Sequence, residues 1–238
     1  MQPNGKRGPL RLLVVLGLLP FAIKAAALAW FAQNYLAQSV YKIAQLLVPV
    51  GWRRRFDGRR GWASVWPVDE PLPSASTWLL AVAIAALSIA ASSQLVPWFA
   101  AQVGFEPSQL REHFDARFAL TPWRAAAVVI YLATINAGLE ELHFRAWLDR
   151  ELSMRLGSAT GIALSAATFA GMHTFIFAGM EGLTLWMLGG VFAGLLVMGI
   201  AWSLLARRPG GIHAAWLSHG LTDAGFLGWG LYWLGYLS

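Results

Sequence analysis

The sequence contains no cysteine and few charged residues. With no cysteine among its 238 residues, the chain can form no disulfide and offers neither a thiol nucleophile nor a cysteine-ligated zinc or iron–sulfur centre. Charged residues make up 13% of the chain, against about 25% in an ordinary soluble domain. The motifs GxSxG and HExxH are absent as well. The sequence therefore supports neither a serine hydrolase with a nucleophile elbow nor an ordinary zincin.

Long apolar runs take the place of the missing charges. Hydrophobic residues make up 57% of the chain, and they lie in continuous runs rather than in the alternation of a β-barrel. We therefore predict an all-α polytopic membrane protein, a bundle of about seven transmembrane helices (six to eight) that forms a single integral membrane domain over residues 1–238. The clear spans are expected at about 12–32, 78–99, 122–139 with a helical extension to 155, 160–178, 183–205 and 212–236.

Two N-terminal features leave alternatives open. The first apolar run is interpreted as a transmembrane helix, although Ala25-Ala26-Ala27 would also suit the cleavage site of a signal peptide. Residues 35–50 are less apolar and contain Lys42. This segment is therefore either a second span or a helix that lies at the membrane surface.

The basic residues predict how the chain crosses the membrane. The net charge is +6, and the basic residues form short clusters between apolar runs, as they do in the cytoplasmic loops of membrane proteins. The strongest cluster, residues 53–60, is interpreted as a topology signal rather than as a patch for nucleic acid or anionic lipid. Seven spans place the N-terminus in the cytoplasm, and the composition suggests the inner membrane of a bacterium. The lipid bilayer is an expected partner and nucleic acid is not; the oligomeric state is not predicted.

A charged stretch, Gly138–Ala146, follows directly on an apolar run. An ionised carboxylate at the centre of a membrane helix costs about 3 kcal/mol on insertion scales, so such residues usually have a use. Glu141 and Arg145 are four residues apart and lie on one face of a helix, where they can pair. Glu140 is rotated by about 100° from Glu141, and no basic residue of its own helix neutralises it. We predict that Glu141 supports the helix and that Glu140 is available for chemistry.

Two later segments add histidines. His173 lies in the next apolar segment, and His219 lies in the last one, followed four residues later by Asp223. Glu140 lies 17 residues before a predicted turn at Gly157 and His173 lies 16 residues after it, so both reach the same height in an antiparallel helix pair. The last helix starts on the same side of the membrane, and His219 lies roughly 12 Å along it. We therefore predict that these four side chains share one layer in the cytoplasmic half of the membrane.

The residue types suit hydrolysis of a peptide bond. A carboxylate in a low-dielectric cavity can act as a general base on water, and a histidine can pass the proton to the leaving amine. A further donor can stabilise the tetrahedral oxyanion. No cofactor is expected in this interpretation. The alternative is zinc, with Glu140, His173 and His219 as ligands and an open position for water.

Three motifs occur in order over the C-terminal half of the chain: Glu140-Glu141-x-x-x-Arg145, Phe169-x-x-x-His173 and His219-x-x-x-Asp223. Together they resemble the motifs of the CAAX protease and bacteriocin-processing (CPBP, Abi) family of intramembrane endopeptidases. The resemblance covers roughly residues 120–238. It implies a catalytic helix core over residues 121–238 and leaves residues 1–120 as N-terminal helices of unassigned role.

The resemblance also implies roles for single residues. Glu140 would activate water together with His173, and His219 would stabilise the oxyanion together with residue 223. The family commonly has Asn at the position of Asp223, and an ionised Asp cannot donate to an oxyanion. Asp223 is therefore expected either to stay protonated or to orient His219.

The sequence thus predicts an intramembrane endopeptidase that acts by glutamate-activated water attack, with supporting roles for Glu141 and Arg145. Its substrate would be a membrane-associated protein or peptide, cleaved near its C-terminus or as a precursor. A prenylated substrate is not expected, because bacteria generally lack prenylated CAAX proteins. The competing interpretation is a non-enzymatic membrane protein, such as an immunity factor, a scaffold or a transporter, whose buried charges are structural. The lack of an obvious inverted repeat argues against a transporter.

Overall fold

The computed structural model describes residues 8–30, 40–57, 70–104, 108, 111, 112, 115, 121–177 and 184–236. All regular secondary structure in these ranges is helical, which confirms the all-α class. In chain order the elements are α1 (Leu10–Trp30), α3 (Tyr41–Trp52), η1 (Arg53–Asp57), α4 (Ala75–Val103), α6 (Pro122–Tyr131), η3 (Leu132–Asn136), α7 (Ala137–Glu141), η4 (Leu142–Asp149), α8 (Arg150–Leu156), α9 (Ser158–Phe177), α10 (Leu185–Ala206) and α11 (Gly211–Trp233).

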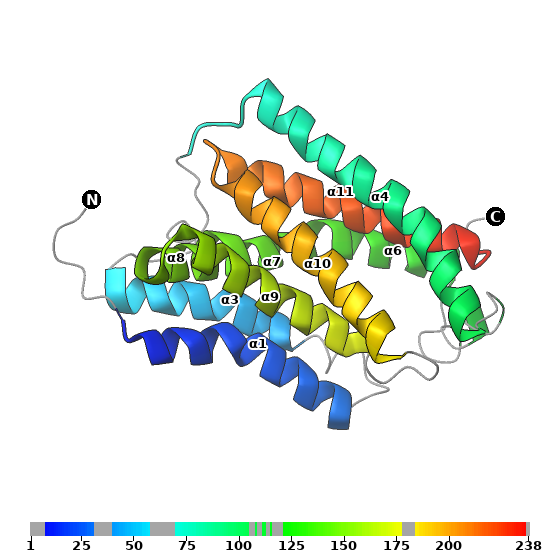
Figure 1. Cartoon of the computed structure of the whole chain (residues 1–238), viewed down its shortest axis with the longest axis horizontal. Coiled ribbons are helices and arrows are strands. Elements are labelled where there is room, and N and C mark those ends of the chain that lie inside the picture. The colour runs from blue at the N-terminus through cyan, green and yellow to red at the C-terminus, as the bar shows by residue number, and fades with distance from the viewer. Residues whose placement is uncertain are drawn as a thin grey trace.

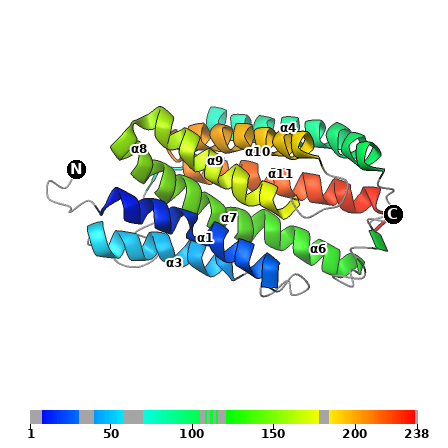
Figure 2. The same cartoon turned by 60° about the horizontal axis from the view of Figure 1, so that its bottom comes forward.

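The helices run side by side along one long axis (Figure 1). The segment from α6 to α8 passes through the middle of the bundle. Helices α1 and α3 lie on one side of it, and α4, α10 and α11 lie on the other, an arrangement that Figure 2 shows from a second direction. The central segment therefore has neighbours from both the N-terminal and the C-terminal parts of the chain.

The central segment is one helix of 35 residues, Pro122–Leu156. It opens with a proline in its first turn, as predicted, where the missing N–H would have no partner in any case. Two stretches of wider π-helical turns, η3 and η4, flank the short α7. Such turns are often found at functional sites. The helix ends at Gly157, whose φ of +89° lies in the region that favours glycine, and this confirms the predicted stop.

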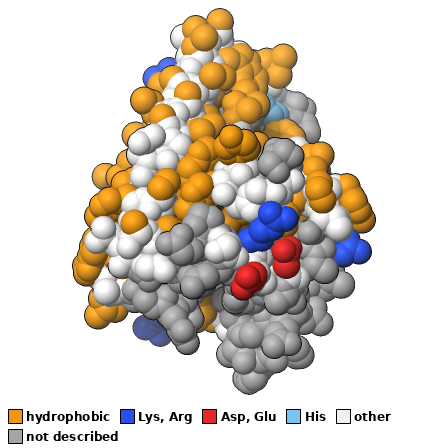
Figure 3. All heavy atoms as spheres, turned by 90° about the vertical axis from the view of Figure 1, so that its right-hand side faces the viewer, with side chains coloured by type: hydrophobic (Ala, Val, Ile, Leu, Met, Phe, Trp, Pro, Cys, Tyr) orange, Lys and Arg blue, Asp and Glu red, His pale blue; other side chains and the backbone are white. Residues whose placement is uncertain are grey.

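Among the described residues, four helices are long and apolar enough to cross a membrane: Leu10–Ala27, Ala75–Gln102, Pro122–Leu156 and Leu185–Ala206. Large apolar side chains point outward from two of them, including Leu87 of α4 and Leu185 of α10, which are 73% and 87% exposed. Figure 3, a view onto one end of the bundle, shows apolar side chains over the flanks and charged side chains gathered at the end. An apolar flank of this kind suits a lipid environment.

Helix α3 occupies the segment for which two alternatives remained. Residues 35–39 lie outside the described residues, and the described helix, Tyr41–Trp52, has 12 residues, a length of about 18 Å. It runs along the bundle axis beside α1 (Figure 1). Its inner face buries Tyr41, Lys42, Ala44 and Gln45. This segment is therefore part of the packed bundle and contributes polar side chains to its interior.

The charged stretch 149–155 is buried in part. Asp149 and Glu151 are only 2% and 3% exposed, whereas Met154 is 53% exposed. Asp149 pairs with Arg207 of the α10–α11 turn at 2.5 Å. Glu151 pairs with Arg155 at 2.9 Å and lies 3.6 Å from Arg53 of η1. Opposite charges from three separate elements satisfy one another, so this end of the bundle can pack closely.

Candidate active site

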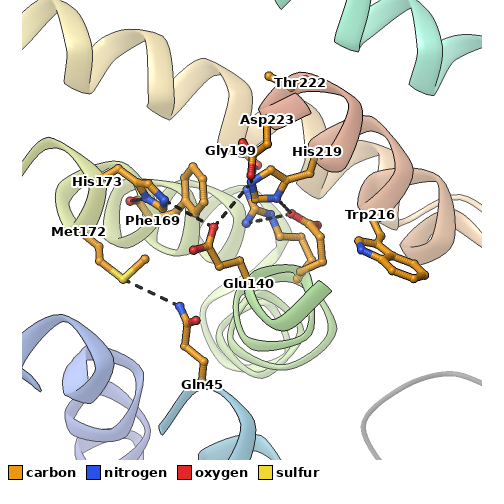
Figure 4. Close-up of polar contacts among 12 residues, drawn as sticks. Gln45, Glu140, Phe169, Met172, His173, Gly199, Trp216, His219, Thr222 and Asp223 are labelled. Carbon is orange, nitrogen blue, oxygen red and sulfur yellow. Dashed lines mark hydrogen bonds and ion pairs between the residues drawn. The ribbon is translucent and has the colours of Figure 1, made fainter. Parts of the chain in front are cut away.

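The two adjacent glutamates lie on α7, in the middle of the bundle, and both are buried. Glu140 is 1% exposed and Glu141 is fully buried. Figure 4 shows Glu140 between His173 of α9 and His219 of α11, with Gln45 of α3 on another side. The prediction that the three motifs meet in one layer is therefore confirmed by their geometry.

Glu141 makes the predicted pair with Arg145, with Oε1 3.3 Å from Nη1. The guanidinium is 2% exposed and lies over the rings of Phe169 and Trp202, 4.5 and 5.3 Å from their centroids. Cation–π contact adds to the stabilisation of such a buried cation. Glu141 also has a second partner, because its Oε1 accepts a hydrogen bond from Nδ1 of His219 at 2.9 Å.

The ring of His219 is held on several sides. It stacks on Trp202 with centroids 4.0 Å apart and planes 16° apart, and Phe169 meets it edge-on. The indole N–H of Trp202 donates to Oγ of Ser218, the residue before His219, at 3.2 Å. Since Nδ1 donates to Glu141, the free ring nitrogen is Nε2, which lies 3.6 Å from Oε2 of Glu140. The ring is thus fixed with Nε2 directed at Glu140.

His173 approaches the same oxygen from α9. Its Nδ1 lies 2.9 Å from the carbonyl oxygen of Phe169. A carbonyl only accepts, so Nδ1 carries the proton and donates. Nε2 then faces Oε2 of Glu140 at 3.4 Å. The two histidines therefore present their Nε2 atoms to one carboxylate oxygen, and neither contact is a short hydrogen bond.

The two oxygens of Glu140 have different surroundings. Oε2 has no hydrogen-bond partner among the described residues. Oε1 is paired with Nζ of Lys42 at 2.5 Å. Glu140 does lack a basic partner on its own helix, as predicted, but α3 supplies one. The carboxylate of Glu140 therefore has its cationic neighbour on a helix that is distant in sequence.

Asp223 lies at the edge of the site. Its Oδ2 is 3.7 Å from Nε2 of His219, beyond hydrogen-bond distance, and its side chain is 26% exposed. The contact that orients His219 comes from Glu141, which holds the other ring nitrogen. The side chain of His173 is also partly exposed, at 20%, whereas those of Glu140 and His219 are at 1% and 2%. His173 and Asp223 are therefore the more exposed members of the site.

Three buried polar residues around this layer were not among the predicted site residues. Lys42 pairs with Glu140, and Gln45, one turn further along α3, reaches the sulfur of Met172. His143 is fully buried, and its Nε2 contacts the carbonyl oxygen of Gly17 in α1. A lysine inside an otherwise apolar run was the available signal, because such a residue normally needs a buried partner.

A metal would need three suitable ligands close together. Glu140, His173 and His219 are the predicted zinc set, and their Oε2 and Nε2 atoms approach one another. Across the described ranges, however, no group of three His, Asp or Glu side chains has an arrangement that could hold a metal ion.

The family comparison agrees with these motifs. Residues 122–225 match the family of type II CAAX prenyl endopeptidases described as Rce1-like. These residues form an Rce1-like domain. The match begins at the first residue of α6 and ends within α11, so the Rce1-like domain contains Glu140, His173, His219 and Asp223.

The match confirms the resemblance inferred from the motifs, and a domain of this family implies a peptidase with a protein or peptide substrate. Comparisons with curated proteins and with solved structures give no match. Helix α3 carries Lys42, and both α1 and α3 contact the central helix that bears the glutamates. These two helices lie outside the matched range.

Proposed function

We propose that this protein is a polytopic intramembrane endopeptidase that uses Glu140 as its general base. The observation that carries the proposal is the buried Oε2 atom of Glu140, which faces two histidine Nε2 atoms and has no hydrogen-bond partner among the described residues. A water molecule bound there would meet one acceptor that can take its proton. General-base catalysis requires this kind of contact.

The reaction follows from these positions. Glu140, assisted by His173, takes a proton from water while the oxygen attacks the carbonyl carbon of the scissile peptide bond. The negative charge that forms on the carbonyl oxygen is stabilised by His219, when Nε2 carries a proton, and by Asp223 in its protonated form. The proton then passes from Glu140 or His173 to the leaving nitrogen as the C–N bond breaks. The products are one new carboxyl group and one new amine.

The exposed members of the site indicate how a substrate enters. Only His173 and Asp223 present part of their side chains to the outside, so an extended peptide would approach from their side. We infer that the substrate is a membrane-embedded protein or peptide, because the helix that carries Glu140 is long and apolar enough to cross a membrane. Cleavage near a C-terminus or in a precursor fits such a substrate.

The proposal includes a membrane arrangement. About seven spans, with the N-terminus in the cytoplasm of a bacterium, would place the basic end of the bundle at the inner face of the inner membrane. The four apolar helices and the packing of α3, α9 and α11 among them support this arrangement. Residues 121–238 would form the catalytic core and residues 1–120 the supporting helices of one membrane domain.

The experiment compares Glu140→Gln with the wild type for cleavage of candidate membrane peptides in detergent, with and without a chelator. Loss of cleavage in a folded Glu140→Gln protein, with no effect of chelator, is the expected result. Cleavage that is inhibited by the chelator would instead indicate a zinc mechanism. Glu70→Gln is the control, because Glu70 pairs with Arg150 at the surface. Equal cleavage by Glu140→Gln and the wild type would leave the charge cluster as a structural feature of a non-enzymatic protein.

A further inference from the structure

The Lys42–Glu140 pair joins the N-terminal helices to the Rce1-like domain. Lys42 of α3 is 7% exposed, and its Nζ lies 2.5 Å from Oε1 of Glu140. Almost a hundred residues separate the two in sequence. A buried lysine is rare in an apolar interior and is normally paired. Its partner here is the proposed general base, which therefore has a cation in direct contact with it.

The Lys42 contact gives the two oxygens of the Glu140 carboxylate different partners. Oε1 is occupied by Lys42, and Oε2 faces His173 and His219. Glu140 turns freely about its last bond unless something holds it, because that torsion is broad. The ammonium at Oε1 fixes which oxygen is presented to the histidines. It also supplies the opposite charge that an ionised carboxylate needs when it is buried.

A second lysine provides an internal comparison. Lys24 of α1 is also 7% exposed, and its Nζ contacts the hydroxyl of Tyr41 at 3.5 Å. Both lysines lie over the ring of Tyr41, at 4.7 Å for Lys24 and 4.5 Å for Lys42. The two cations are therefore matched in burial and in their aromatic neighbour, but the hydrogen bond to Glu140 is made by Lys42.

We propose that Lys42 is a positioning residue of the active site, which holds Glu140 by Oε1 so that Oε2 meets the attacking water between the two histidines. This inference rests on the proposed peptidase function. It assigns α3, which lies outside the Rce1-like domain, a direct part in that function. Lys42 acts through Glu140 and does not itself contact the reacting atoms.

The first test needs no substrate. Lys42→Met and Glu140→Gln each leave one buried charge unpaired, so each should lower the melting temperature in detergent by about 5 °C or more. The double variant removes both charges and should lose clearly less than the sum of the two single losses. Lys24→Met combined with Glu140→Gln is the control and should deviate less from the sum of its single losses, because the hydrogen bond of Lys24 is to Tyr41 rather than to Glu140. Additive losses for Lys42→Met and Glu140→Gln would overturn the pairing.

The second test measures cleavage by proteins that fold. Lys42→Met should lower kcat about a hundredfold, as displacement of a catalytic group by about 1 Å can do, while KM changes less than about threefold because substrate contacts remain. Lys42→Arg should recover part of kcat, and Lys24→Met should keep kcat near the wild-type value. If the wild type cleaves and Lys42→Met cleaves equally well, the positioning role is wrong and the peptidase function stands. If the wild type cleaves no peptide, both proposals fail.

Discussion

Nδ1 of His219 lies 2.9 Å from Oε1 of Glu141, the same oxygen that faces Nη1 of Arg145 at 3.3 Å. One buried carboxylate oxygen therefore serves both a neighbour on its own helix and a histidine on α11. Glu141 is expected from the sequence to be a supporting residue, and the structure gives that support a definite form. It fixes the ring of His219 so that the opposite nitrogen is directed at Glu140.

Glu141→Gln should destabilise the protein. The amide can still accept from His219, but it removes the negative charge beside Arg145, which is 2% exposed. Breaking a buried ion pair by removing one partner costs about 3–5 kcal/mol. A thermal melt in detergent should show a clear decrease, whereas Glu70→Gln, which breaks a surface pair, should change stability by less than about 1 kcal/mol. Equal melting temperatures for the two variants would contradict the structural importance of Glu141.

Asp223→Asn should keep cleavage near the wild-type rate or raise it. An amide always has N–H groups to donate, whereas the carboxyl of Asp223 can donate to an oxyanion only when protonated. Asp223→Ala removes the donor and should lower kcat by about 10²-fold, the usual loss for one oxyanion donor. Steady-state cleavage by the two folded variants tests this. Similar losses in both would mean that the negative charge of Asp223 is what matters.

Gly220→Ala should displace α11. A Cβ at this position would come within 2.2 Å of the carbonyl oxygen of Ala133, and backbone cannot move aside as a flexible side chain can. Overpacking of this kind costs about 1–3 kcal/mol or more, and it would shift the adjacent His219. Gly228→Ala on the same helix meets nothing within 4 Å, so it should be neutral or slightly stabilising. Gly220→Ala should therefore lower both the melting temperature and kcat, whereas Gly228→Ala should lower neither.

Ser218→Ala should destabilise the protein, because the indole N–H of Trp202 loses its acceptor. Ser218 is fully buried and accepts the indole N–H of Trp202, which stacks on His219. Leaving that N–H without an acceptor costs about 1–3 kcal/mol. In a Trp202→Phe background the same serine substitution should have little effect, because no N–H remains to satisfy. Chemical denaturation of the four proteins measures this coupling, and equal effects of Ser218→Ala in both backgrounds would contradict it.

Much of the fold can be predicted because membrane helices carry strong local signals. The proline at 122, the glycine at 157 and the apolar runs between them fix helix ends within a few residues of those observed. Counting residues from Gly157 is sufficient to bring Glu140 and His173 to one height. The role of residues 35–50 could not be decided in this way, because moderate hydropathy suits both a surface helix and a packed one.

The remaining parts of the site depend on contacts between distant segments. Nothing in the spacing of Lys42 relates it to Glu140, and helical periodicity within 138–146 accounts only for neighbours on that helix. The buried Asp149 and Glu151 illustrate the same limit. A run of charged residues predicts a solvated segment, and the sequence does not show that the fold places Arg207 and Arg53 against it.

The contribution of α3 has a consequence for inhibitor selectivity. A compound that only fills the space between the two histidines would address chemistry shared by proteins with the same three motifs. A compound that also extends toward Lys42 and Gln45 would contact side chains from a segment that the family match does not include. Discrimination between this protein and peptidases that contain an Rce1-like domain would therefore be sought on the α3 side of Glu140.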